Sequence, residues 1–170
     1  MLGGYADDLR EAILRIKRPG AEHLARALAA LLVDKQRSVL DALGIDAVVP
    51  VPMHWWRRAC RGTSDAEEVA RAMARALGVR VTAALVRSRA TQMQNELPPE
   101  ERGGNVAGAF RVRATVAGRR LLLVDDVVTT GATLAACCKA LRDAEALVVH
   151  VAALAKADRL ADAAGSGESR

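Results

Sequence analysis

The run LLLVDDVVTTGATL, residues 121–134, constrains the fold of this chain more than any other stretch. Four uninterrupted apolar residues, 121–124, are typical of a strand that is buried on both faces of a parallel sheet. Asp125 and Asp126 then close the predicted strand, and a turn rich in hydroxyl groups follows. Apolar residues recur at helical spacing after the turn, which predicts a helix that begins near Gly131. The run therefore predicts an α/β fold.

The same run suits a ribose 5-phosphate. The start of a helix leaves N–H groups without partners and carries a partial positive charge, so it binds phosphate well. Adjacent carboxylates repel a phosphate but accept hydrogen bonds from two vicinal hydroxyls of a ribose. An ordinary strand and helix with capping threonines is the alternative, and the complete run favours the ligand site. The candidate binding residues are Asp125, Asp126, Val127, Val128, Thr129, Thr130, Gly131, Ala132 and Thr133.

A second loop is also predicted to join the end of a strand to the start of a helix. The apolar run 45–52 predicts a strand that ends at two prolines, and the helix after the loop is expected to start with a capping box, Ser64 and Glu67. Arginines in the loop can hold a pyrophosphate by charge and by forked hydrogen bonds. A solvated basic loop is the alternative. The candidate pyrophosphate residues are Met53, His54, Arg57, Arg58, Arg61 and Gly62.

The polar segment 88–104 is too long for an ordinary connection between two elements. Long loops of this kind commonly act as lids over a site. Its candidate residues for an anionic ligand are Arg87, Arg89, Gln94 and Arg102.

Periodicity along the rest of the chain alternates between helical and strand patterns. Helices are predicted over residues 5–16 and 21–44, and strands over residues 79–86, 105–112 and 147–154. The segment 156–170 is rich in small and polar residues and is predicted to be a partly disordered tail.

Composition limits the class of protein. A chain of 170 residues, half of them hydrophobic, predicts one domain with an aliphatic core, because aromatic residues make up only 2%. The net charge of +5 favours anionic ligands such as nucleotides, diphosphates or nucleic acid, although the basic residues are spread along the chain. Three cysteines form no CxxC pair, and no apolar stretch is long enough to span a membrane. Without a recognisable secretory signal, a cytoplasmic protein is expected.

The run 125–133 resembles the motif by which type I phosphoribosyltransferases bind phosphoribosyl pyrophosphate (PRPP). The order of motifs along the chain further resembles the ComF family of competence-related proteins. The residues that carry this resemblance are Lys17, Pro50-Val51-Pro52 with His54, Arg61-Gly62, Gln94, Leu97, Arg102, Asn105-Val106 and Gly108-Ala109-Phe110. Two features depart from the family: a four-cysteine zinc module is missing, and Asp65 places a negative charge near the pyrophosphate loop.

The resemblance implies the type I phosphoribosyltransferase fold: a central, mostly parallel sheet flanked by helices, within residues 1–155. A small hood is expected from about residues 1–20 and 87–113. PRPP is expected with Mg²⁺, which ligand oxygens and water near Asp125 and Asp126 would hold without a dedicated protein cage.

The implied reaction is transfer of the phosphoribosyl group to an acceptor with release of pyrophosphate, with catalytic roles for Arg61, Asp125 and Asp126. Hypoxanthine-type relatives carry an acid where this chain has Thr129, which argues against a 6-oxopurine acceptor. Two alternatives stay open: a non-catalytic PRPP- or nucleotide-binding accessory in competence and DNA uptake, and an accessory that binds single-stranded DNA. Competence proteins, nucleic acid and a second copy of the chain are the candidate partners.

Overall fold

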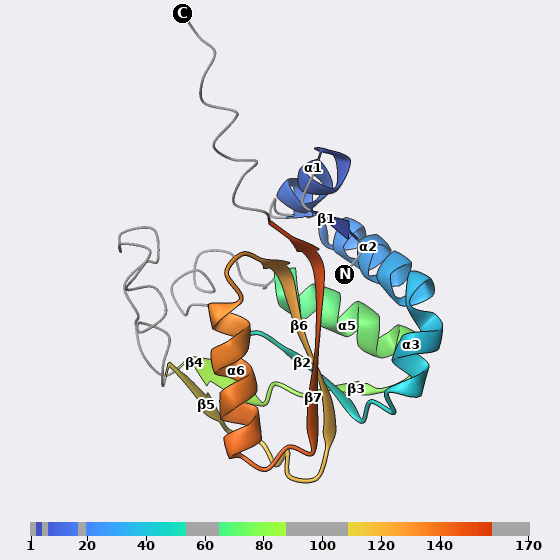
Figure 1. Ribbon diagram of the computed structural model, residues 1–170. Helices are drawn as coiled ribbons and strands as arrows, with labels where there is room; N and C mark the ends of the chain where they lie inside the picture. The colour runs from blue at the N-terminus through green and yellow to red at the C-terminus, as the bar shows by residue number, and fades with distance from the viewer. Residues whose placement is uncertain (1–2, 5–6, 17–19, 54–64, 88–108, 158–170) are drawn as a thin grey trace, which may run out of the picture.

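The computed structural model describes residues 3–4, 7–16, 20–53, 65–87 and 109–157. In this part of the chain, three consecutive helices follow the first strand, and four consecutive strands precede the last helix (Figure 1). The elements are β1 (Gly3–Gly4), α1 (Asp7–Ile16), α2 (Glu22–Lys35), α3 (Arg37–Ala42), β2 (Ala47–Pro50), α5 (Asp65–Leu77), β3 (Arg80–Val81), β4 (Leu85–Arg87), β5 (Phe110–Val112), β6 (Arg120–Val128), α6 (Ala132–Asp143) and β7 (Val148–Lys156).

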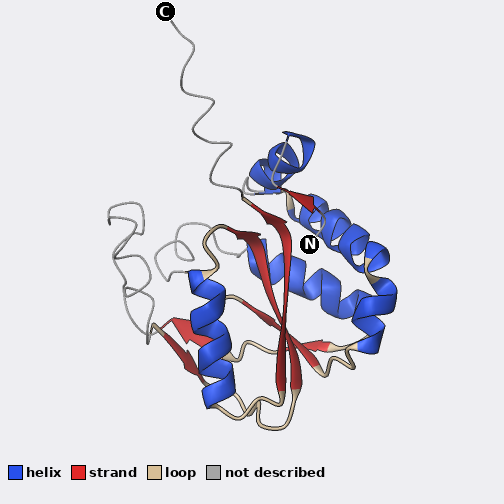
Figure 2. Ribbon diagram, in the orientation of Figure 1, coloured by secondary structure: helices blue, strands red, loops and turns tan. Residues whose placement is uncertain are grey.

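The main sheet has five parallel strands in the order β1-β7-β6-β2-β3, and β4 and β5 form a separate antiparallel pair. The central strand of the main sheet is β6, in which Leu121 lies opposite Ala47 of β2 and Val149 of β7. Figure 2 shows helices on both sides of the strands. This is the predicted fold class, a mostly parallel sheet flanked by helices, and the structure confirms it.

Alternation along β6 divides the core into two clusters. Leu122 and Val124 pack with residues of α2 and α5 on one face of the sheet. Leu121 and Leu123 pack with Cys137, Leu141 and other residues on the opposite face, where α6 lies (Figure 1). All four β6 residues are almost completely buried, which explains why the sequence shows an apolar run here instead of an alternating pattern.

Three predicted boundaries were wrong. The acidic pair does not close its strand: β6 continues to Val128, because β7 supplies backbone partners as far as Lys156. The strand predicted over residues 79–86 is two short strands in different sheets, β3 and β4. The helix predicted over residues 21–44 is interrupted at Gln36, between α2 and α3.

The other predicted elements are confirmed where the structure describes them. They correspond to α1, β2, α5, β5, α6 and β7. The capping residue Ser64, part of the strand predicted over residues 105–112 and most of the tail lie outside the described residues, as does much of the predicted hood, which stays a prediction. Within the described ranges, no helix has both the length and the apolar character needed to cross a bilayer.

Candidate functional site

A small pocket lies where β6 leads into α6, at the carboxyl end of the central strand. One continuous stretch of chain forms it, so the site depends on local geometry more than on distant contacts. Its volume is about 30 Å³, which leaves room for a small group and not for a whole nucleotide. The lining residues are Asp125, Val127, Val128, Thr129, Thr130, Gly131, Ala132, Thr133 and Leu134.

The start of α6 gives this pocket its chemistry. Gly131 caps the helix with a φ of 76°, a left-handed conformation that side-chain-bearing residues rarely adopt. The Thr130 Oγ1 accepts a long hydrogen bond of 3.4 Å from the Ala132 N–H. The first turn of α6 contains no acidic residue. No carboxylate of the helix itself therefore repels an anion at its positive end.

The two aspartates at this end of β6, Asp125 and Asp126, lie differently with respect to the pocket. Asp125 lines the pocket, whereas Asp126 is not among the lining residues. Successive side chains of a strand point to opposite faces, and both aspartates are half-buried at this end of β6. The Asp126 N–H donates a hydrogen bond of 2.9 Å to the Asp125 Oδ1. The structure therefore brings all the predicted motif residues except Asp126 into one pocket, together with Leu134, which the sequence analysis did not place among the binding residues.

The buried thiol of Cys137 lies close enough to Asp125 of β6 and Arg87 of β4 for their charges to affect its pKa. Burial raises the pKa of the Cys137 thiol, the negative charge of Asp125 raises it further, and the positive charge of Arg87 opposes this rise. Burial also raises the pKa of Cys138. Both thiols therefore stay protonated near neutral pH, and neither is suited to act as a nucleophile.

Arg87, which the sequence analysis assigned to the lid, lies on β4. Its cross-strand partner is the buried Phe110 of β5, and the Arg87 Cζ stands 5.6 Å from the centre of that ring. A cation over an aromatic face at this distance is attracted by the ring. In this structure Arg87 is therefore part of the two-stranded sheet.

Of the predicted pyrophosphate loop, the structure describes Met53, which is half-buried just after β2. The Val51 N–H donates to the Val124 carbonyl at 2.9 Å, so the chain leaves β2 beside the residue that precedes Asp125. This loop therefore starts at the same edge of the sheet as the pocket. The remaining predicted residues of the loop and lid, and Lys17, lie outside the described residues: His54, Arg57, Arg58, Arg61, Gly62, Arg89, Gln94 and Arg102.

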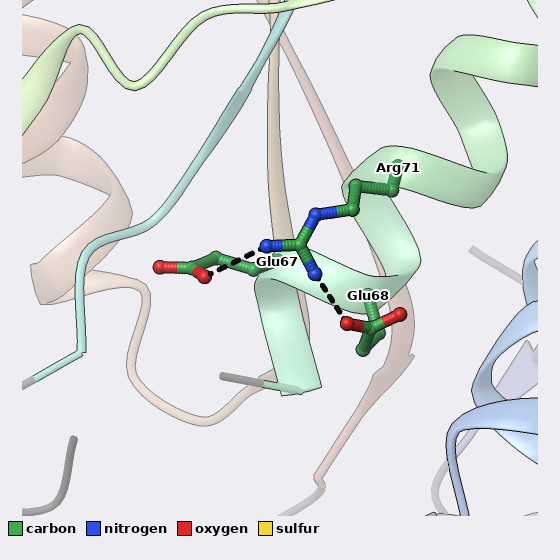
Figure 3. Close-up of polar contacts among 3 residues, drawn as sticks. All are labelled: Glu67, Glu68 and Arg71. Atoms are coloured by element: carbon green, nitrogen blue, oxygen red, sulfur yellow. Dashed lines mark hydrogen bonds and ion pairs between the residues drawn. The ribbon is translucent and has the colours of Figure 1, made fainter. Parts of the chain in front are cut away.

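The helix after that loop begins very differently from α6. Asp65, Glu67 and Glu68 occupy the first turn of α5. Arg71 bonds to Glu67 Oε2 at 3.2 Å and, more closely, to Glu68 Oε1, so that one guanidinium joins both carboxylates (Figure 3). The first turn of α5 therefore carries carboxylates of the protein itself, two of which bond to Arg71.

Comparisons with known proteins agree with this architecture. A family model described as a phosphoribosyl transferase domain matches residues 63–166. The DNA utilization protein YhgH of Escherichia coli (strain K12) is 33% identical over 135 residues, which cover 77% of this chain and 60% of that protein. Competence protein F of Haemophilus influenzae is 31% identical over 165 residues, which cover 92% of this chain and 72% of that protein.

The chain therefore belongs to the phosphoribosyl transferase domain family and, within it, to the ComF group of competence-related proteins. This confirms the resemblance in the sequence. Among solved structures, the glutamine PRPP amidotransferase of B. subtilis superposes with a TM-score of 0.58 at 22% identity, over 86% of this chain and 30% of that chain; that likeness supports the fold alone. The chain spans about 60% of the length of its YhgH relatives.

Proposed function

We propose that this chain binds PRPP together with Mg²⁺ and transfers its phosphoribosyl group to an acceptor, with release of pyrophosphate. The observation that carries the proposal is the pocket at the start of α6, where a helix terminus without acidic residues meets Asp125. The α6 terminus and the threonine hydroxyls would bind the 5-phosphate. Asp125 would accept a hydrogen bond from a ribose hydroxyl.

In the proposed reaction, the bond between ribose C1 and the diphosphate oxygen breaks, and pyrophosphate leaves with the electron pair. A lone pair of the acceptor then forms the new bond to C1. The arginines of the loop after β2, Arg61 above all, are proposed to stabilise the departing negative charge. Asp125 and the α6 terminus hold the sugar so that C1 faces the acceptor, which lowers the entropic cost of reaction.

We propose that Mg²⁺ is held mainly through its ligand. Within the described ranges, no group of three or more His, Cys, Asp or Glu residues could hold a metal ion. Mg²⁺ usually keeps several waters and binds substrate phosphates with one or two carboxylates, and Asp125 and Asp126 are the carboxylates that we propose for this role. When bound, Mg²⁺ would neutralise the charge that develops on pyrophosphate.

A second candidate function rests on the names of the relatives. Proteins called competence protein F and DNA utilization protein are similar to this chain, which favours a role in DNA use, with the same pocket binding PRPP or a nucleotide without catalysis. The acceptor, partner proteins, dimer formation and cytoplasmic location remain predictions.

Two measurements test the proposal and separate its alternatives. PRPP with Mg²⁺ should raise the melting temperature, because a ligand that binds only the folded state adds about 2.7 kcal/mol at a hundredfold excess over its Kd. Asp125→Asn should remove the shift, whereas Asp143→Asn, at the far end of α6, should keep it. If the wild type shows no shift, the PRPP site is wrong.

Turnover is then measured as pyrophosphate release with a panel of bases. Release with one base identifies the acceptor. A thermal shift without release from any base supports the non-catalytic alternative.

A further inference from the structure

The last strand of the main sheet, β7, has a long side that pairs with little else. On one side β7 pairs with β6 from Val148 to Lys156, whereas on the other side β1 pairs with it only at Ala155 and Lys156. Figure 1 shows β7 crossing the front of the molecule, with β1 beside its end. In the part of the chain that the structure describes, residues 148–154 therefore have a strand on one side alone. We call residues 147–154 the open edge.

The backbone groups that point outward from the open edge follow from its pairing with β6. The Leu147 N–H donates to the carbonyl of Arg119, just before β6, at 2.9 Å. The register with β6 is constant along β7, and backbone groups alternate between the two sides of a strand. The N–H and C=O groups of Val148, His150 and Ala152 therefore point away from β6. Such a row of outward-pointing groups is a template for a further strand.

The open edge also exposes apolar side chains. Leu147, Val148 and Val151 are 59%, 37% and 47% exposed, respectively. Because successive side chains alternate between the faces of a sheet, Val148 and Val151 lie on opposite faces. Neither face of β7 is thus fully covered by helices at this end of the strand.

The sequence of the open edge, LVVHVAAL, contains no proline and no Asp, Glu, Lys or Arg. Edge strands usually avoid pairing with other chains by being short or by carrying charges, proline or bulges. β3, at the other end of the strand order, fits that rule, since it is two residues long and begins with the exposed Arg80. The open edge has none of these devices. Because it is neutral, two copies of it do not repel each other, although the whole chain has a net charge of +5.

We propose that a second copy of this chain pairs with the open edge in an antiparallel manner, so that the two main sheets become one. A two-fold axis through the sheet makes this contact self-complementary. The second copy must end its pairing before Ala155, where β1 lies, and residues that point outward must face each other. The register that meets both conditions and covers every exposed apolar side chain places Val148 opposite His150 and Leu147 opposite Val151 of the second copy.

This register explains why the occupant is a copy of the same chain. The pairs of Val148 with His150 exchange their N–H···O bonds across the two-fold axis, and the pairs of Leu147 with Val151 bring exposed apolar side chains together. A strand of another protein would cover these side chains only if it were equally apolar. Ala153, opposite Asp125 of the pocket, lies beyond the paired residues, so the pocket stays accessible. The inference does not rest on the proposed transferase activity.

The first test measures the mass of the full chain by size-exclusion chromatography with light scattering, between roughly 1 μM and 1 mM protein. The wild type should reach twice the chain mass of 18.0 kDa. Val148→Lys with Val151→Lys should raise the dissociation constant of the dimer about 10-fold or more, because each substitution acts in both copies. The matched control, Val39→Lys with Val81→Lys, changes two exposed valines of α3 and β3 in the same way and should behave as the wild type.

The second test fixes the register with a disulfide. Opposite residues of this kind have Cα atoms about 4.5 Å apart, which lies within the range of disulfides. Leu147→Cys with Val151→Cys should therefore give a covalent dimer on mild oxidation. Neither single variant should do so, because each residue is roughly 13 Å from its own counterpart in this register. The wild type, run alongside, records the background from the native cysteines.

Three results would overturn the proposal. The first is a wild type that stays monomeric at every concentration, which would leave the open edge to another protein or to another segment of this chain. The second is an equal loss of dimer in the lysine variant and its control. The third is a double-cysteine variant that forms no more covalent dimer than the single variants. Melting temperatures show whether the variants fold; if the lysine variant does not, the cysteine variants decide.

Discussion

Two helices, α5 and α6, follow strands that end at the same edge of the sheet, and their first turns differ in charge. The first turn of α5 contains three carboxylates, two of them joined by Arg71. The first turn of α6 contains none, and glycine and threonine residues line the pocket there. Carboxylates in the first turn of a helix offset its partial positive charge, so such a helix attracts an external anion less strongly. The comparison therefore favours α6 over α5 as the anion site that we propose.

The same comparison bears on the predicted pyrophosphate loop. Because the start of α5 is already occupied by acidic side chains, a diphosphate at the preceding loop would have to be held by side chains of the loop itself. Asp65, which departs from the family pattern, is one of these acidic residues. The account therefore depends on loop arginines such as Arg61 for the diphosphate and on the α6 terminus for the 5-phosphate.

The largest effect is expected when the first turn of α6 is made acidic, like the first turn of α5. Ala132→Asp places a carboxylate in the first turn of α6, next to the proposed phosphate. Two like charges about 4 Å apart near a protein surface repel by roughly 4 kcal/mol, so PRPP affinity measured by calorimetry should fall at least about 100-fold. Ala135→Asp, at an exposed position one turn later, is the control and should have a much smaller effect. Similar affinities for the two variants would count against the α6 site.

Gly131→Ala tests the backbone that shapes the pocket. The φ of 76° at Gly131 makes any side chain there costly by about 1–2 kcal/mol. Gly118→Ala is the matched control, because Gly118 has a similar φ of 68° and lies just before β6, at the end of that strand opposite to the pocket. Chemical denaturation should show comparable losses of stability in both variants, and only Gly131→Ala should also weaken binding of ribose 5-phosphate. Equal ligand binding by the two variants would mean that the turn at Gly131 does not shape the site.

A smaller effect concerns the thiol behind the pocket. Burial and the Asp125 charge raise the Cys137 pKa in the folded state, whereas in the unfolded chain a thiol ionises near pH 8.5. The Cys137 contribution to stability is therefore full below about pH 8.5 and is lost as pH rises above it, by up to about 1.4 kcal/mol per pH unit. Urea denaturation between pH 7 and 10 should show a shallower decline for Cys137→Ala than for the wild type. The same decline in both would contradict the burial of this thiol.

The smallest expected effect concerns the ion pairs in the first turns of α5. Arg71→Gln removes the guanidinium that joins Glu67 and Glu68. Because Arg71 is substantially exposed, the loss of stability should be only about 0.5 kcal/mol, measured by thermal denaturation. Affinity for ribose 5-phosphate should not change. A marked loss of affinity would show that the start of α5 takes part in anion binding.

The sequence predicted the centre of the molecule well because its signals there are local. The apolar residues before Asp125 form an uninterrupted run since both faces of β6 are covered, and Gly131 stands where the backbone needs a positive φ. The end of β6 could not be predicted in this way. Its extension through Asp125 and Asp126 depends on pairing with β7, which is more than twenty residues away in the sequence.

Placement of residues within the sheets was harder still. Arg87 was predicted to fold over an anionic ligand with the lid, and this stays a prediction; its pairing with Phe110 on β4 could not be read from the local sequence. The apolar run 147–154 predicted a strand but not its open edge, because strand order is not encoded in a local pattern.

The most direct test of the central claim is a titration of ¹⁵N-labelled protein with ribose 5-phosphate, followed through the backbone amide resonances. The account predicts that the largest shift changes fall on Thr129–Leu134, at the start of α6. Amides of the first turn of α5, Asp65–Glu68, should change little. Changes concentrated on α5 or elsewhere, with the α6 amides unaffected, would contradict the claim that α6 holds the phosphate.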